Sequence, residues 1–475
     1  MVTGQSQEQM QAILEKLQAE QLAEGIPPAE VRRQRIQTVI DMLVDNQDAL
    51  AQALDQDYGG RHEYLTRMSE VMQSIGHLKD AKKKLHKWMK PEKRQPLPPM
   101  GLFGAKAQLR YQPKGVIGIM SPWNYPIAMV INPLATALAA GNRVMVKPSE
   151  FNPKTAELLE QLFSKYFPGG EVTVVNGGPE TGAAFAALPL NHIIFTGATG
   201  IGRKVMEAAA RNLTPVTLEL GGKSPVIISR TADIAEAAAR IMNGKATNAG
   251  QACVSPDYVF VPEESMETFI DACRAIFREQ FPTALDNQDY SCVVNDRHCA
   301  RITGYIHEAQ QAGVRVENLG TEEITEGKRR IPVHIVVDPG EDLAIMQEEI
   351  FGPAMIVKPY QKLEPCVDYI NQRPSPLALY YFGKDKAEQA WVLDHTLSGG
   401  VTVNEVLMHV ACTDMPFGGV GASGIGNYHG REGFRTFSHA RSVFTEGWLN
   451  IAKLAGTLPP YSDKVGKMLA SQIKK

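Results

Sequence analysis

A carboxylate and a thiol stand out in one short stretch of the sequence. Glu219 comes near the end of the apolar segment Val216–Leu220, and Cys253 follows Gly250 and Gln251 on a turn after a predicted helix. Together they suggest covalent catalysis, in which the sulfur attacks a carbonyl carbon and the carboxylate later directs water at the acyl-enzyme. The other motifs of the chain are candidates for positioning this pair.

Cys253 also has a structural interpretation, because most free cysteines simply pack in protein interiors. Its position on a turn, outside any apolar stripe, separates it from the other five cysteines. A good nucleophile at neutral pH needs a thiol pKa below the ordinary value of about 8.5. The preceding helix ends at this turn, so its dipole does not explain such a shift, and the sequence shows no other cause.

A strand, a glycine-rich turn and the start of a helix follow one another over residues 191–211. The N-terminus of a helix exposes N–H groups and a partial positive charge, which suits a pyrophosphate. The spacing of Gly197, Gly200 and Gly202 is not the regular dinucleotide fingerprint, so a plain turn remains an alternative. An acidic ribose ligand about 20 residues beyond the glycines would be Glu219.

The segment Val144–Glu150 offers a competitor for the ribose. Lys147 and Glu150 stand at the end of another predicted strand, and Glu150 could bind paired ribose hydroxyls while repelling a 2′-phosphate. This favours NAD over NADP. The alternative for Lys147 and Glu150 is an ordinary surface ion pair.

Two further segments carry polar or aromatic side chains on predicted loops or strand edges. Asn124 lies between Pro122 and Pro126, a rigid setting that suits a side-chain amide aimed at a developing oxyanion. Taken alone, the segment favours a buried turn asparagine over that role. Glu349 and Phe351 are two residues apart and could form an ordinary strand edge. No His, Cys or carboxylate cluster has the spacing of metal ligands.

Composition limits the classes of function. A chain of 475 residues is long enough for two or three domains, and its net charge of -3 gives no electrostatic case for nucleic acid. The six cysteines form no Cys-x-x-Cys pair, and we expect no signal peptide and reduced thiols in the cytoplasm. The most apolar segment, Ile127–Ala140, is too short to span a bilayer.

The expected elements place these residues at the ends of strands. Residues 6–56 predict two amphipathic helices and residues 62–90 a third, whose lysine run we interpret as a solvated face. From Val116 to Leu220, short apolar runs alternate with helical stretches, and the second half of the chain shows the same alternation. The pattern predicts an α/β protein with two doubly wound parallel sheets, whose chemistry lies at the carboxyl ends of the strands.

The motifs, taken together and in order, resemble the NAD(P)-dependent aldehyde dehydrogenase superfamily. The resemblance spans residues 110–440, and its final glycine-rich stretch is similar to the class 3 and fatty-aldehyde branch, within it to bacterial coniferyl aldehyde dehydrogenases. The seven motifs are Pro122–Pro126, Val146–Glu150, Phe195–Gly197, Leu218–Pro225, Gly250–Cys253, Glu349–Pro353 and Pro416–Gly419.

The resemblance implies a role for each motif. Cys253 would be the nucleophile, Glu219 the general base, and Asn124 with the backbone N–H of Cys253 the oxyanion hole. Asn404 would lie beside the substrate, and no metal is implied. The implied cofactor contacts, for NAD and possibly NADP, are Trp123, Lys147, Ser149, Glu150, Thr196, Gly197, Ala198, Gly202, Leu220, Gly221, Glu349 and Phe351.

The resemblance also implies an organisation into domains. Residues 1–103 and 115–219 would form N-terminal helices and an NAD-binding domain, and residues 220–405 a catalytic domain. Residues 104–114 with about 428–445 would form a β-flap that pairs two subunits into a homodimer, and residues 450–475 a surface tail. Ala198 stands where many members have Ser, and the loop at 418–421 lacks the Lys of many tetrameric members, as in the class 3-like branch.

The expected activity is oxidation of an aldehyde to its acid through a thioester on Cys253. The substrate is expected to be an aromatic, coniferyl-type aldehyde, with a medium-chain aliphatic aldehyde and use of NAD or NADP as the alternative. Three rivals remain: a CoA-acylating or phosphorylating dehydrogenase, a cofactor-free thiol esterase, and a catalytically retired binding or structural protein on the same fold.

Overall fold

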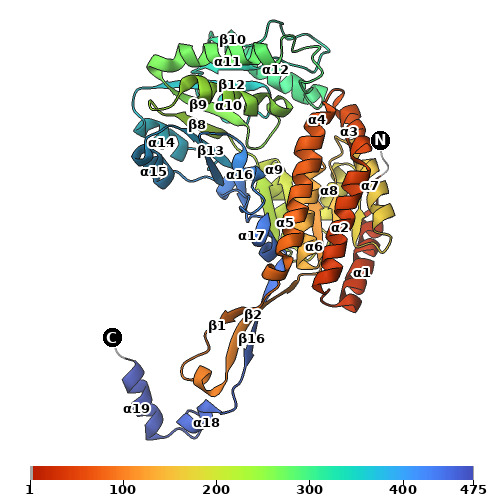
Figure 1. Ribbon diagram of the computed structural model, residues 1–475, viewed down its shortest axis with the longest axis vertical. Coiled ribbons are helices and arrows are strands. Elements are labelled where there is room, and N and C mark those ends of the chain that lie inside the picture. Colours follow the sequence, from red (N-terminus) through yellow and green to blue (C-terminus); the bar gives the residue numbers. More distant parts are fainter. Residues whose placement is uncertain (1–3, 474–475) are drawn as a thin grey trace.

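A computed structural model describes residues 4–473, and Figure 1 shows its two α/β units and a thin arm that carries the C-terminus away from them. The first unit has a six-stranded sheet of order β15-β7-β6-β3-β4-β5, and the second a seven-stranded sheet of order β10-β11-β12-β9-β8-β13-β14. Both are mainly parallel. The doubly wound α/β fold predicted from the sequence is confirmed.

The first sheet is parallel except for its last strand. Its strands are β3 (Val116–Met120), β4 (Arg143–Lys147), β5 (Val172–Val174), β6 (His192–Gly197), β7 (Val216–Leu220) and the antiparallel β15 (Gly424–Ile425). Residues of β3 and β4 are buried throughout, as expected for strands covered on both faces. Part of the glycine-rich stretch at 418–426 supplies this edge strand, beside β7.

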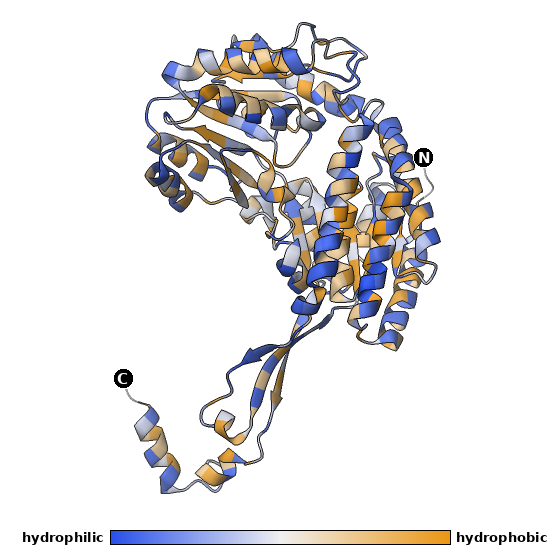
Figure 2. Ribbon diagram, in the orientation of Figure 1, coloured by the Kyte–Doolittle hydropathy of each residue, from blue (hydrophilic) through white to orange (hydrophobic). Residues whose placement is uncertain are grey.

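Helices cover both faces of this sheet. The helices α6 (Ala128–Ala140) and α7 (Pro153–Tyr166) share one core with α2 (Ala29–Asp45), α3 (Gln47–Tyr58) and α5 (Gln73–Trp88). The helices α1 (Gln7–Glu24), α8 (Pro179–Ala186) and α9 (Thr199–Ala210) pack on the other face. In Figure 2 the apolar residues concentrate on the strands and on the inner sides of these helices.

The N-terminal helices are more broken than their sequence predicts. Asn46 separates α2 from α3 with φ of -120°, and its side-chain amide bonds the Met42 carbonyl, so residues 6–56 form three helices and not two. The predicted helix over 62–90 consists of α4 (Glu63–Thr66), a π-helical segment Arg67–Met72, and α5. Single π-helical turns often occur near functional sites.

The second unit follows the same plan. Its strands are β8 (Ser224–Ile228), β9 (Pro256–Pro262), β10 (Val316–Asn318), β11 (His334–Val337), β12 (Ala354–Tyr360), β13 (Ala378–Phe382) and β14 (Gly400–Val403). The helices α10 (Ile234–Ala246) and α11 (Met266–Gln280) share the first core. A second core contains α12 (Asp296–Gln311), α13 (Ala344–Gln347), α14 (Glu364–Asn371) and α15 (Lys386–His395). The short α16 (Met408–Ala411) follows β14.

The arm is a three-stranded antiparallel sheet of order β1-β2-β16. It joins β1 (Glu92–Arg94), β2 (Lys106–Pro113) and β16 (Ser438–Thr445), so it includes a strand outside the flap segments named above. Within the range 428–445, α17 (Gly430–Thr436) packs on α6 instead. Beyond the arm, α18 (Ile451–Ala455) and α19 (Asp463–Gln472) have no buried residues.

Candidate active site

A cavity of about 510 Å³ opens at the carboxyl ends of the strands of the first sheet and reaches the second unit. The structure brings eleven of the residues proposed from the sequence to its wall. They are Trp123, Asn124, Thr196, Gly197, Ala198, Glu219, Leu220, Gly221, Cys253, Glu349 and Phe351. Parallel strands deliver several of these side chains to one edge, because their carboxyl ends coincide.

Glu219 is placed by the regular geometry of β7. In the sheet register it lies between Thr196 of β6 and Gly424 of β15. The residue is 1% exposed, and neither carboxylate oxygen has a hydrogen-bond partner within residues 4–473. Burial raises the pKa of Glu219 well above its ordinary value, because the charged carboxylate is not solvated there.

Cys253 lies on the irregular segment between α10 and β9, and it is half-buried. Three consecutive residues before it, Asn248, Ala249 and Gly250, have φ of 50°, 52° and 72°, in the left-handed region. This conformation is costly for residues other than glycine. The segment must therefore be held by interactions with its surroundings.

Gln251 supplies many of those interactions. Its side chain is fully buried and donates to the carbonyls of Asn248 at 2.9 Å and Cys292 at 3.0 Å. Its side-chain oxygen accepts from the Val294 N–H at 2.9 Å. Gln251 thus ties the strained turn to the segment 292–294 and fixes the position of Cys253.

The electrostatic environment of Cys253 favours the neutral thiol. Burial, together with repulsion of the thiolate by the carboxylates of Glu349 and Glu219, raises its pKa to about 12. The lowered pKa that a nucleophile needs is therefore not provided by the protein's own neighbouring groups. The side chains of Glu219 and Cys253 cannot both be charged here without a large penalty.

The Asn124 amide is held next to the Cys253 turn. Its Nδ2 donates to the carbonyl of Gln251 at 3.1 Å, and the residue is 4% exposed on the cavity wall. An amide has two N–H donors. The second has no partner in the described part of the chain, so it is available to a group inside the cavity.

Glu349 and Phe351 approach the cavity from the segment before β12. The Glu349 carboxylate lies against Gly221, where a Cβ atom would overlap it. Burial raises the pKa of Glu349 to about 8. Phe351 has φ of 46°, and its ring meets the Trp123 ring edge-on at 5.2 Å between centroids.

Five of the residues proposed from the sequence do not line this cavity. Gly202 is in the first turn of α9, and a Cβ there would come within 2.6 Å of the Leu220 side chain. Asn404 makes both of its side-chain hydrogen bonds to the backbone of Gly383, at 2.8 and 3.0 Å. Of the remaining three, Lys147 is the last residue of β4, and Ser149 and Glu150 follow that strand.

Lys147 is more buried than a surface ion pair would be. It is 5% exposed, donates to the Pro148 carbonyl at 2.7 Å, and lies 3.6 Å from the Glu150 carboxylate, which is 35% exposed. Burial lowers the pKa of the Lys147 ammonium. Ser149 accepts a hydrogen bond from the Phe151 N–H through its Oγ.

The residues between β6 and α9 fit the pyrophosphate of a dinucleotide. The helix has no side-chain cap, and the N–H groups of Thr199 and Gly200 have no hydrogen-bond partner among residues 4–473. A Cβ atom at Gly200 would face open space, so a ligand can approach these donors closely. Unpaired N–H groups and the helix dipole favour an anion at this position.

Several residues of the cavity wall were not predicted from the sequence. Arg301, on α12, donates to the carbonyls of Glu349 at 3.3 Å and Ile350 at 2.9 Å and so holds that segment. Arg301 belongs to none of the sequence motifs, so the sequence did not predict its place at the site. Phe417 does belong to the motif Pro416–Gly419. The other unforeseen wall residues include Ser69, Gln73, Met129, His298, Leu407, Met408, Val410 and Ala411.

Two kinds of feature are absent from residues 4–473. No group of three or more His, Cys, Asp or Glu side chains is arranged to hold a metal ion. No helix in that range combines the length and apolarity needed to cross a bilayer.

Comparison with known proteins identifies the family. The model of the aldehyde dehydrogenase family matches residues 1–443. A relative from Caulobacter vibrioides, named "Probable coniferyl aldehyde dehydrogenase", is 50% identical over 470 residues, which are 98% of this chain and 97% of the relative.

Solved structures agree. The substrate-bound Staphylococcus aureus AldH has a TM-score of 0.91 at 34% identity, covering 98% of this chain and 99% of that one. A Mycobacterium tuberculosis aldehyde dehydrogenase complexed with NAD+ has a TM-score of 0.84 at 28% identity, covering 94% and 92%. The chain therefore belongs to the aldehyde dehydrogenase family and is an NAD(P)-dependent oxidoreductase that acts on aldehydes.

Proposed function

We propose that Cys253, Glu219 and Asn124 carry out the oxidation, and that the preferred substrate is an aromatic aldehyde of the coniferyl type. The observation that supports these roles is their position on one cavity, together with the glycine-rich turn after β6. The sulfur of Cys253 adds to the aldehyde carbon, and the carbonyl oxygen becomes an oxyanion. The free N–H of Asn124 and the backbone N–H of Cys253 stabilise that oxyanion.

The proton movements follow from the two raised pKa values. Cys253 rests as a thiol, so its proton must leave as the carbon–sulfur bond forms. Glu219 has no other partner in the described structure and accepts that proton. After oxidation to the thioester, Glu219 releases that proton to solvent and takes one from the attacking water. The water oxygen bonds to the carbonyl carbon, the carbon–sulfur bond breaks, and Glu219 returns the proton to the departing sulfur as the acid leaves.

The cofactor is proposed to bind across the turn after β6. Thr199 and Gly200 would hold the pyrophosphate, Lys147 and Glu150 the adenosine ribose, and Glu349 the nicotinamide ribose, while Phe351 would pack against the ring. When bound, NAD(P) accepts the two electrons lost by the aldehyde. The exposed Glu150 carboxylate would repel a 2′-phosphate, which supports a preference for NAD.

The wall of the cavity supports an aromatic substrate. Apolar side chains from distant segments line it, among them Met129, Leu407 and Phe417. Ser69 and Gln73 add polar groups, and Gln73 makes no side-chain hydrogen bond within residues 4–473. A free amide on this wall can bond the phenolic hydroxyl of a coniferyl-type aldehyde, a group that a medium-chain aliphatic aldehyde lacks.

We also propose a homodimer in the cytoplasm. The outer edge of β16 is not paired with any other strand in the described chain, and Phe444 and Trp448 nearby are 51% and 78% exposed. An open strand edge with exposed aromatic residues can pair with a second copy. All six cysteines are free, in keeping with a reducing compartment. Light scattering should give twice the chain mass for the native protein and a smaller value for Phe444→Glu.

The test of the catalytic roles is NADH formation with coniferyl aldehyde, benzaldehyde, hexanal and acetaldehyde, each with NAD and with NADP. Cys253→Ala should abolish turnover, and Asn124→Ala should lower kcat roughly 100- to 1,000-fold. Near wild-type turnover in Asn124→Ala would remove Asn124 from the mechanism. A preference for hexanal over coniferyl aldehyde would overturn the substrate proposal.

A further inference from the structure

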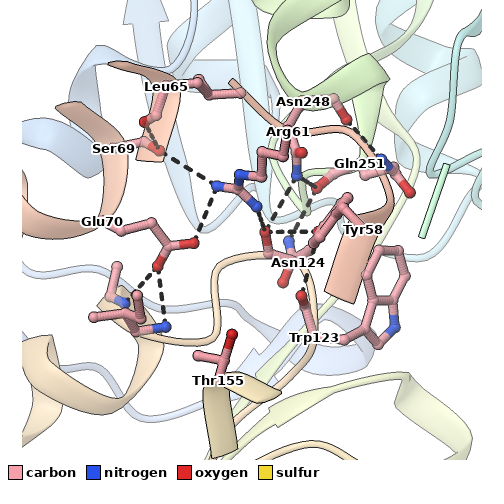
Figure 3. Close-up of polar contacts among 12 residues, drawn as sticks. Tyr58, Arg61, Leu65, Ser69, Glu70, Trp123, Asn124, Thr155, Asn248 and Gln251 are labelled. Carbon is pink, nitrogen blue, oxygen red and sulfur yellow. Dashed lines mark hydrogen bonds and ion pairs between the residues drawn. The ribbon is translucent and has the colours of Figure 1, made fainter. Parts of the chain in front are cut away.

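The loop that carries Asn124 is held through its backbone by side chains from other parts of the chain. Figure 3 shows three donors that converge on the carbonyl oxygen of Asn124. They are Arg61 Nη1 at 2.7 Å, the Tyr58 hydroxyl at 3.1 Å and Asn248 Nδ2 at 3.2 Å. One carbonyl oxygen offers two lone pairs, so three donors make this an unusually well-fixed position.

Arg61 is itself buried and held by several contacts. It is 1% exposed, and its guanidinium lies 5.0 Å from the ring centroids of both Tyr58 and Tyr125. Its Nη2 is 3.0 Å from Glu70 Oε1 in an ion pair whose two side chains are both 0% exposed. The planar guanidinium can serve the Asn124 carbonyl and the Glu70 carboxylate together, which a lysine ammonium could not do in the same geometry.

Glu70 extends this support to the other end of the loop. Its Oε2 accepts from the backbone N–H of Ile127 at 3.0 Å and of Ala128 at 2.8 Å, where α6 begins. Because α6 has no side-chain cap of its own at its N-terminus, Glu70 fills that role from a distance. The ion pair thus clamps the chain at residue 124 and again at residues 127–128.

We propose that Arg61, oriented by Glu70, is a positioning residue for the reaction, and that it acts by fixing the side-chain amide of Asn124. This rests on the proposed role of Asn124 as oxyanion donor. Neither Arg61 nor Glu70 lines the cavity, so neither can touch the substrate. A donor must stay within about 0.5 Å of its productive position to act on a transition state. Fixing the backbone carbonyl of Asn124 fixes the backbone to which the donating side-chain amide is attached.

A double-mutant cycle separates this role from general stabilisation by a buried ion pair. The variants are Arg61→Met, Asn124→Ala and the double variant, assayed for kcat and for KM with NAD and aldehyde. We expect Arg61→Met to lower kcat about 10- to 100-fold with little change in KM, since it would lose much of the oxyanion contribution. In the Asn124→Ala background the same change should alter kcat by less than about 3-fold, because coupled residues are not additive.

Arg32→Met is the matched control for the loss of a buried arginine. Arg32 is also 1% exposed and bonds two backbone carbonyls, those of Pro27 and Ala139, but it has no contact with the Asn124 loop. It should lower the melting temperature and leave kcat near the native value. If Arg61→Met does not fold, Tyr58→Phe removes one donor to the same carbonyl and keeps the ring. It should lower kcat a few-fold in the native background and not in Asn124→Ala.

The outcomes distinguish this inference from the proposed function. A large loss in Asn124→Ala with native kcat in Arg61→Met, or in Tyr58→Phe where that variant replaces it, would overturn the positioning role and leave the oxyanion role intact. Equal losses of kcat from Arg61→Met or Tyr58→Phe in the native and the Asn124→Ala backgrounds would also overturn the positioning role. Near wild-type kcat in Asn124→Ala would remove the oxyanion role and the positioning role together.

Discussion

Glu219 and Cys253 line the same cavity but lie on different kinds of backbone. Glu219 belongs to a regular strand with hydrogen-bonded neighbours on both sides, and its side chain makes no hydrogen bond within the described residues. Cys253 follows a left-handed turn that is tied down by the side chains of Gln251 and Asn248. The sheet positions one residue, and specific side-chain contacts position the other.

The difference reflects what each group must do. A general base needs a raised pKa, and a carboxylate in a strand can be buried without partners, since the backbone alone fixes its place. A nucleophile must reach into a cavity from a loop, and left-handed residues such as Asn248 and Ala249 cost about 1–3 kcal/mol each. Buried hydrogen bonds, at about 0.5–1.5 kcal/mol each, help to offset that cost.

The strand side of this comparison is tested by Glu219→Gln, for which we expect the largest loss among the variants that keep the nucleophile. Gln has nearly the same shape but cannot accept a proton, so kcat should fall about 10²- to 10⁴-fold. Because Glu219 takes a proton both in thiol addition and in thioester hydrolysis, rapid-mixing experiments should show slow NADH formation without a burst, and mass spectrometry should show little thioester on Cys253. The control is Glu207→Gln on the exposed face of α9. Native kcat in Glu219→Gln would contradict the role of the base.

The loop side is tested by Gly250→Ala. Gly250 has φ of 72°, and a Cβ atom would overlap the carbonyl oxygen of Gly352, which is backbone and cannot move easily aside. Overpacking of this kind costs about 1–3 kcal/mol, so we expect a lower melting temperature and at least about a 10-fold loss of kcat.

Gly304→Ala is the matched control for that change. Gly304 lies inside α12, and a Cβ atom there would meet nothing within 4 Å. Alanine should stabilise this helix by about 0.5–1 kcal/mol and leave kcat unchanged. If both glycine variants behave alike, the turn before Cys253 is not under strain.

The contrast between the Glu219 strand and the Cys253 turn also explains how much of the site could be predicted from the sequence. The apolar segment Val216–Leu220 is a strand with those same bounds, because a buried parallel strand is encoded locally. Placement of Glu219 at the cavity follows from that. The left-handed turn at 248–250 was not predicted, because its conformation depends on Cys292 and Val294, which are distant in the sequence.

Contacts between distant segments account for the other features that the sequence did not predict. Ser69, Glu70 and Gln73 lie within the predicted helix 62–90, and Arg61 directly precedes it. Amphipathic periodicity describes the face toward the core and not the few polar positions near a cavity. The edge strand β15 comes from a glycine-rich segment without strand propensity. Its glycines are needed because Cβ atoms at 419 and 424 would overlap neighbouring backbone.

A smaller effect is expected for Gln73→Leu, which tests whether a helix-borne amide adds substrate selectivity. Loss of one neutral hydrogen bond at a partly exposed site should lower kcat/KM for coniferyl aldehyde about 2- to 10-fold. The value for cinnamaldehyde, which has no phenolic hydroxyl, should not fall. Gln52→Leu on the exposed face of α3 is the control. Equal losses for both aldehydes would exclude the proposed contact.

The smallest effect concerns the electrostatic cost of placing Cys253 among carboxylates. The charge of Glu349 raises the pKa of Cys253, and the Glu349 pKa is itself about 8, so this charge is present mainly above pH 8. Glu349→Gln removes it, which lowers the Cys253 pKa and increases the thiolate fraction. Without cofactor, iodoacetamide should therefore modify Cys253 about 2- to 5-fold faster in the variant at pH 9, since a full unit of pKa would be tenfold.

That difference in modification rate between the native protein and Glu349→Gln should vanish as the pH falls. Near pH 6 Glu349 is protonated in the native protein, so native and variant proteins should react at the same rate. The exposed Cys412 serves as an internal control, and peptide mass spectrometry should show equal labelling of it in both proteins. A larger difference at pH 6 than at pH 9 would mean that the variant changes access to the sulfur and not its charge. Loops that bring reactive groups together would then be limited by packing, not by electrostatic repulsion.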